Sequence, residues 1–160
     1  MNPLSVRLLM VLLAVAVADP AFTQSVRRQP LLLGTWQLDL SRSTYFPGPP
    51  PVSETRTYTA DAKGVLGVIK RAHANGQVET IEYRADFDRE QAVTGTPAYD
   101  SITLKMIDEF TAESTLSHAG SVFGTARRLI SPDGNTLTIM FVRKTSDDTV
   151  RNVAIYRRIQ

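Results

Sequence analysis

The sequence lacks cysteine, and this absence excludes several classes of site. A chain without cysteine has no disulfide, no thiol nucleophile and no residue for a lipoprotein anchor. Only two histidines are present, and neither His73 nor His118 has carboxylates at the spacing of a zinc site. Gly-x-Ser-x-Gly and phosphate-loop motifs are missing as well. We therefore predict no metal, no cofactor and no catalytic residue, and we rank enzyme activity below a binding or structural role.

Runs of one charge are also missing from a chain whose formal net charge is +2. Arg127-Arg128 and Arg157-Arg158 are pairs rather than runs. Because successive residues of a strand face opposite sides, neither pair makes a basic patch by itself. We predict no nucleic-acid partner, and the sequence leaves the oligomeric state open.

One uninterrupted apolar segment, Leu8 to Ala18, stands near the start of the chain. It is shorter than the roughly 20 residues that a bilayer span needs. Arg7 precedes it, and Ala16-Val17-Ala18 has the small-x-small form of a signal cleavage site. We predict a signal peptide over 1–18, a flexible segment over 19–32 and one domain over 33–160. The mature protein would be periplasmic or extracellular and would have no stable membrane anchor; an uncleaved anchor is the less favoured alternative.

Helical periodicity is nearly absent after the signal, and short alternating runs take its place. Turn residues separate these runs every 8–12 residues or so, which is typical of a β-sandwich or β-barrel. The predicted strands cover 34–40, 54–60, 65–72, 77–88, 101–107, 110–117, 121–130, 136–144 and 150–159. Hairpin turns such as Asn75-Gly76 and Pro132-Asp133-Gly134-Asn135 join neighbours. Since closure removes exposed sheet edges, we predict a single antiparallel up-and-down β-barrel of about 8–9 strands.

The first and last predicted strands carry a family resemblance. Gly34-Thr35-Trp36 opens the first strand, and Ile155-Tyr156-Arg157-Arg158 ends the last one. The chain in this respect resembles the calycin superfamily of lipocalins and fatty-acid-binding proteins. The resemblance implies that Trp36 plugs one end of the barrel. It also implies that Arg158, or Arg157, packs over the tryptophan ring in a cation–π contact of about 0.5–2 kcal/mol.

A closer similarity covers nearly the whole mature chain. The chain resembles small exported bacterial lipocalin-like proteins that have no established activity. The matching stretches are 34–38, 47–49, 93–97, 101–108 and 127–138. In fatty-acid-binding proteins an Arg-x-Tyr pair on the last strand holds the ligand carboxylate. Ala154 and Tyr156 stand at the matching positions here, so we expect a neutral or weakly polar ligand rather than a fatty-acid anion.

Aromatic residues within the strands are the candidate ligand-binding residues. They are Tyr58, Tyr83, Phe87, Phe141 and Tyr156. In a hollow barrel these rings would form the apolar wall of a ligand cavity, whereas in a filled barrel they would be core. A lumen of about 300 Å³ or more would favour non-catalytic binding of a small, mostly apolar ligand. A closed lumen would favour a structural or envelope-associated barrel. Thr55, Thr57 and Thr59 would line a partly polar lumen or face solvent, and the sequence leaves both open.

Overall fold

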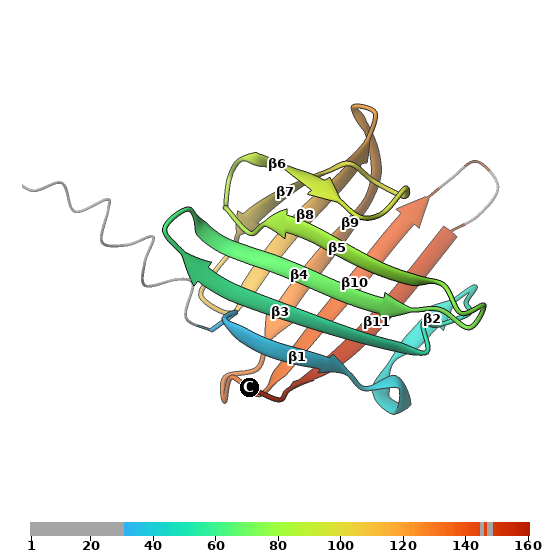
Figure 1. Cartoon of the computed structure of the whole chain (residues 1–160), viewed down its shortest axis with the longest axis horizontal. Helices are drawn as coiled ribbons and strands as arrows, with labels where there is room; N and C mark the ends of the chain where they lie inside the picture. Colours follow the sequence, from blue (N-terminus) through green and yellow to red (C-terminus); the bar gives the residue numbers. More distant parts are fainter. Residues whose placement is uncertain (1–30, 145, 147–148) are drawn as a thin grey trace, which may run out of the picture.

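The computed structural model describes residues 31–144, 146 and 149–160, which form a closed antiparallel β-barrel (Figure 1). The predicted signal peptide, 1–18, and residues 19–30 of the following segment lie outside the described residues. The barrel strands are β1 Gly34–Leu38, β3 Ser53–Asp61, β4 Gly64–Ala72, β5 Val78–Arg84, β6 Glu90–Thr94, β7 Ser101–Met106, β8 Thr111–His118, β9 Ser121–Ile130, β10 Thr136–Lys144 and β11 Thr149–Arg158. A short 3-10 helix, η1 Leu40–Arg42, and an outer strand, β2 Thr44–Phe46, follow β1. Among the described residues, no helix is long and apolar enough to cross a membrane.

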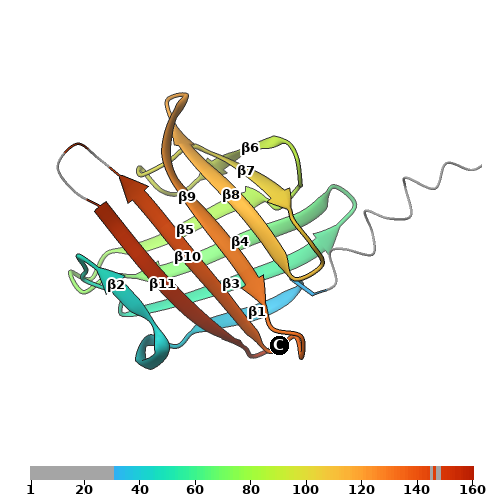
Figure 2. The ribbon, with the colours of Figure 1, turned by 180° about the vertical axis from the view of Figure 1, so that it is seen from behind.

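The strands follow one another round the barrel in chain order, apart from β2 (Figure 2). Pairing of β1 with β11, in the register Trp36↔Arg158 and Leu38↔Tyr156, closes the ring. The up-and-down antiparallel barrel is therefore confirmed, but its strand number of 8–9 is corrected to ten. The additional barrel strand is β6, whose single buried residue is Val93. One buried position in five residues gives no visible alternation of polar and apolar side chains.

The strand predicted over 77–88 ends early for a backbone reason. Its regular pairing stops at Arg84, and Asp88 adopts a positive φ of 60°. This left-handed conformation is uncommon outside glycine and turns the chain toward β6. Ile81, Tyr83 and Ala85 are buried as their alternation predicts.

The outer strand β2 extends the seam between the first and last strands. β1 pairs with the second half of β11, and β2 pairs with its first half in the register Arg151↔Phe46 and Val153↔Thr44. Between them, the Ile155 amide donates to Ser43 Oγ at 2.9 Å. The segment from β1 to β2 therefore follows nearly the full length of β11.

One end of the barrel is closed by Trp36, which is fully buried. The indole Nε1 donates to the Leu32 carbonyl oxygen at 2.9 Å. The Cζ atom of Arg158 lies 4.1 Å from the tryptophan ring centroid. The Arg158 guanidinium also donates to the carbonyl oxygens of Gly134, Leu33 and Leu31. The structure thus places Arg158, and not the exposed Arg157, over the plug.

Alternation along the strands sends one face of each strand into the barrel. On β3 the inward positions are Glu54, Arg56 and Tyr58, all buried, whereas Thr55, Thr57 and Thr59 alternate with them on the outer face. The polar character of the lumen therefore comes from charged residues and not from the threonines. The large, fully buried apolar side chains include Trp36, Ile69, Ile81, Leu104, Leu137 and Val65.

Candidate ligand cavity

The barrel holds a cavity of about 300 Å³ at the end away from Trp36. At roughly 30 Å³ per molecule in the liquid, this volume equals that of about ten waters. Pro49 and Ala98 are exposed and border its mouth. The aromatic lining residues are Tyr45, Tyr83, Tyr99, Phe123, Phe141 and Tyr156, and the charged ones are Glu54, Arg56, Arg71, Arg128 and Arg143, with His73 beside them. The cavity thus combines apolar walls with a small set of charged groups.

The structure brings three of the five candidate aromatics to this cavity, namely Tyr83, Phe141 and Tyr156. The other two lie elsewhere. Tyr58 does not line it, but the Tyr58 and Tyr83 hydroxyls are 3.0 Å apart and their rings meet edge-on. Phe87 lines a second, smaller cavity of about 30 Å³ near the plugged end.

Glu54 of β3 is the anionic centre of the cavity wall and is only 2 % exposed. Arg56 Nε donates to its carboxylate at 2.7 Å, Arg71 Nε at 2.6 Å and the Tyr156 hydroxyl at 2.6 Å. Burial alone would raise the pKa of Glu54, but the Arg56 and Arg71 guanidiniums outweigh it and lower the pKa to about 2. Burial conversely raises the pKa of the Tyr156 phenol well above its usual value. Glu54 is therefore ionised and Tyr156 neutral at physiological pH.

This cluster is poorly suited to proton transfer. An efficient general acid or base has a pKa near the working pH, whereas the pKa of Glu54 is about 2. Each Glu54 oxygen also accepts from a guanidinium at 2.6–2.7 Å. The arrangement instead holds side chains of β3, β4 and β11 in fixed positions relative to one another, which is a structural role.

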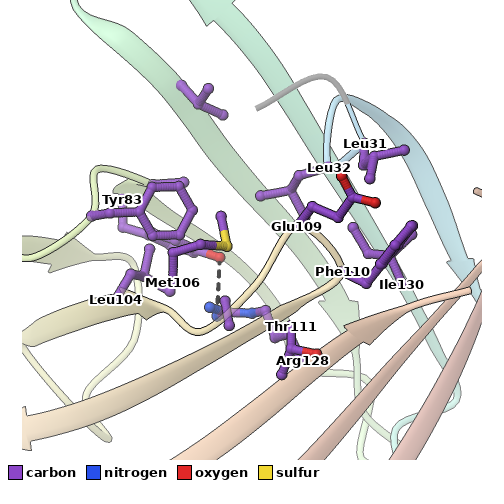
Figure 3. Close-up of a pocket in the computed structure, with 14 residues that line it drawn as sticks. Leu31, Leu32, Tyr83, Leu104, Met106, Glu109, Phe110, Thr111, Arg128 and Ile130 are labelled. Carbon is purple, nitrogen blue, oxygen red and sulfur yellow. Dashed lines mark hydrogen bonds between the residues drawn. The ribbon is translucent and has the colours of Figure 1, made fainter. Parts of the chain in front are cut away.

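Arg128 of β9 is the second buried cation, and its surroundings differ from those of Arg56. It is 7 % exposed, and its Nη2 makes a long 3.4 Å hydrogen bond to the Tyr83 hydroxyl, shown as a dashed line in Figure 3. Its Nε has no hydrogen-bond partner within the described part of the chain. Its cross-strand neighbours are Ala112 and Ile139, neither of which carries charge. Tyr83 and Arg128 line both cavities and therefore lie between them.

Positive charge exceeds negative charge around the large cavity. Glu54 pairs with Arg56 and Arg71, and Glu79 lies 3.4 Å from Arg71. These two carboxylates balance those two guanidiniums. No ion pair within the described residues balances Arg128 or Arg143, and the Arg143 Nε is likewise buried without a partner.

The histidines lie near the mouth and on the surface. His73 lines the large cavity, with its Nε2 3.3 Å from Glu79. His118 is exposed and lies 3.8 Å from Asp100. In the part of the chain that the structure describes, no three histidine or carboxylate side chains are grouped as a metal site requires.

Sequence reasoning misses the buried charges, although a signal for them is present. If Tyr58 faces the lumen, residues two and four positions before it share its face, which places Arg56 and Glu54 inside. The same rule places Arg128 on the same face of its strand as Ala126. A search for cavity residues that considers only aromatic side chains misses these charged positions.

Comparisons with known proteins add no neighbour. No family model, no curated protein and no solved structure matches this chain.

Proposed function

We propose that this protein is an exported, lipocalin-like barrel that binds a small, mostly apolar molecule non-catalytically in its large cavity. The observation that carries the proposal is the cavity itself. Its volume of about 300 Å³ lies at the lower end of the range for small-molecule sites. Apolar walls with a few convergent polar groups are the usual composition of such sites.

The aromatic lining supports binding more than it supports a packed core. Tyr99, Phe123 and Phe141 form a row of rings with centroids about 6 Å apart. All three border empty volume and remain partly exposed. A ligand would bury these faces, and burial of apolar surface contributes about 25 cal/mol per Å² before the costs of binding.

A structural or envelope-associated barrel is the second candidate. The plugged half of the molecule favours it, because Trp36, Leu137 and Val65 are fully buried there and the cavity beside Phe87 measures only about 30 Å³. The two candidates differ in what they predict for the open half. A structural barrel would leave the large cavity without a specific occupant.

A pair of fluorescent probes tests the binding proposal. 1-Anilinonaphthalene-8-sulfonate and N-phenyl-1-naphthylamine share one aromatic scaffold and differ by a sulfonate. The folded protein should bind at least one of them with 1:1 stoichiometry. Native mass spectrometry of protein purified from the producing cell should also detect a bound small molecule. If neither probe binds and the purified protein is empty, the structural candidate replaces the binding one.

A cavity-filling variant locates the bound probe. Ala126→Phe adds a ring to the lumen, because Ala126 is buried and lines the cavity. Thr125→Phe adds the same ring to the outer face and serves as the matched control. Probe affinity should fall at least tenfold in the first variant and stay within twofold in the second. Equal affinities in both variants would place the probe outside the lumen.

Export is a separate part of the proposal and has a separate test. Mass spectrometry of the mature chain should show an N-terminus at or just after Asp19. An intact Met1 in the cytoplasmic fraction would contradict it.

A further inference from the structure

Arg128 is a buried cation that forms no ion pair within the described part of the protein, although Glu109 borders the small cavity with it. Its two strand neighbours are Ala112 and Ile139, and its guanidinium donates to a neutral phenol, that of Tyr83. A buried charge is costly unless a partner of opposite sign lies beside it. Arg56 is comparably buried but has such a partner in Glu54.

The position of Arg128 makes it accessible to a ligand and not to bulk solvent. It borders the large cavity, together with Ser114 and Ala126. The opposite end of that cavity carries the exposed Pro49 and Ala98. A molecule entering at the mouth would therefore reach Arg128 with its leading end.

We propose that the ligand is an amphipathic monoanion whose charged group binds Arg128 at the inner end of the cavity while its apolar body lies along the aromatic walls. This inference rests on the proposed function, since it names the chemical class that the same cavity selects. A guanidinium can present two parallel donors to a carboxylate or sulfonate. Nη2, whose hydrogen bond to the Tyr83 hydroxyl is long, is the donor available to such a group, and the adjacent Nε is buried without a partner among the described residues.

The Arg128 and Arg56 guanidiniums favour the charged form of both neighbouring tyrosines, although burial outweighs them at Tyr83 and raises the pKa of that phenol. Burial raises the pKa of the Tyr58 phenol, but the Arg128 and Arg56 guanidiniums outweigh burial, and the pKa lies below its usual value. The Tyr58 hydroxyl lies 3.0 Å from that of Tyr83, which in turn accepts from Arg128. A ligand anion at Arg128 would supply the charge that this field attracts.

The proposal also changes the ligand expected from the sequence. The expectation of a neutral ligand follows from Ala154, which removes a guanidinium from the last strand. The structure supplies guanidiniums from β3 and β9 instead, through Arg56 and Arg128. Ala154 itself lines the cavity and leaves space there.

The same two naphthylamine probes test the proposal. The anionic probe, 1-anilinonaphthalene-8-sulfonate, should bind the full mature chain at least tenfold more tightly than N-phenyl-1-naphthylamine. Arg128→Met should lower the affinity for the anionic probe at least tenfold and leave that for the neutral probe within about twofold. Circular dichroism of each variant checks that the barrel has folded.

Arg143→Met is the matched control, because Arg143 also borders the cavity and also has an unpartnered Nε. Its side chain stands over the Phe123 ring, toward the mouth. Affinity for the anionic probe should fall much less in this variant than in Arg128→Met. A large loss in Arg143→Met with none in Arg128→Met would overturn the assignment to Arg128.

Ile139→Glu provides a test that does not remove the cation. Ile139 pairs directly with Arg128 across β9 and β10, so a glutamate there supplies an internal counter-ion. Binding of the anionic probe should fall at least tenfold, while the neutral probe is retained. This variant remains informative if Arg128→Met does not fold.

The outcomes separate the anion site from the binding function as a whole. The anion site is refuted if the wild-type chain binds the neutral probe as tightly as the anionic one, or more tightly. It is also refuted if neither Arg128→Met nor Ile139→Glu alters the ratio of the two probe affinities. In either case the cavity remains a binding site. If neither probe binds the wild-type chain, the proposed function itself fails.

Discussion

Replacing Glu54 with glutamine should strongly destabilise the barrel, although it changes only one atom of the side chain. The substitution keeps the shape of the side chain but leaves Arg56 and Arg71 without their shared carboxylate. Breaking a buried ion pair by removing one partner costs about 3–5 kcal/mol. The pKa gives an independent figure: a fall from 4.5 to about 2 corresponds to about 3 kcal/mol.

The pH dependence has a definite sign. The folded-state pKa of Glu54 lies below the unfolded value, so its contribution is fully present above pH 4.5 and is lost as the pH falls toward 2. Urea unfolding of the wild type and Glu54→Gln, followed by the fluorescence of the single tryptophan, should be measured at pH 7, 5 and 3. The difference in unfolding free energy should be the same at pH 7 and 5 to within experimental error and should shrink at pH 3.

Glu82→Gln is the control, because Glu82 is exposed on the outer face of β5. It should change stability by no more than about 0.5 kcal/mol. A Glu54→Gln protein within that same margin of the wild type at pH 7 would refute the reasoning. So would a difference that stays constant down to pH 3.

The remaining predictions concern the plug, a tight turn and the tyrosine pair. Trp36→Ala should cost about 3–5 kcal/mol in urea unfolding, because the indole is fully buried; an unchanged midpoint would contradict the plug. Gly95→Ala should cost about 3 kcal/mol or more, since its Cβ would lie 1.7 Å from a carbonyl oxygen. Gly76→Ala has a similar positive φ but open space, and should cost only about 1–2 kcal/mol; equal losses would refute the clash. Absorbance titration at 295 nm should show one tyrosine ionising below pH 10, absent in Tyr58→Phe, and its persistence there would exclude Tyr58.

The sequence predicts most of the architecture because the strands alternate strongly. Runs such as 65–72 and 136–144 are recovered as β4 and β10 within a residue of their ends. The sequence does not predict β6 and β2, because both strands are short and are stabilised by pairing with neighbouring strands of the sheet. Their own five and three residues contain too few buried positions to show a pattern.

The candidate site is harder to predict because it depends on register across the ring. Tyr156 stands out in the sequence, but its partner Glu54 lies 102 residues away in the chain. Arg128 has no carboxylate opposite it in the sheet, because its paired residues are Ala112 of β8 and Ile139 of β10. No local pattern carries that information; only the closed sheet brings these residues together.

The seam between β1 and β11 has a kinetic consequence. The first and last strands of the domain are the two that close the ring, so closure waits for the whole domain to be present. Pairings between residues far apart in the chain form slowly, because loop entropy is lost before contacts compensate for it. The open intermediate would expose the free edges of β1 and β11, which are templates for intermolecular pairing. Refolding should therefore become less efficient as protein concentration rises. The η1–β2 segment lies along β11 and would shield the free edge of that strand.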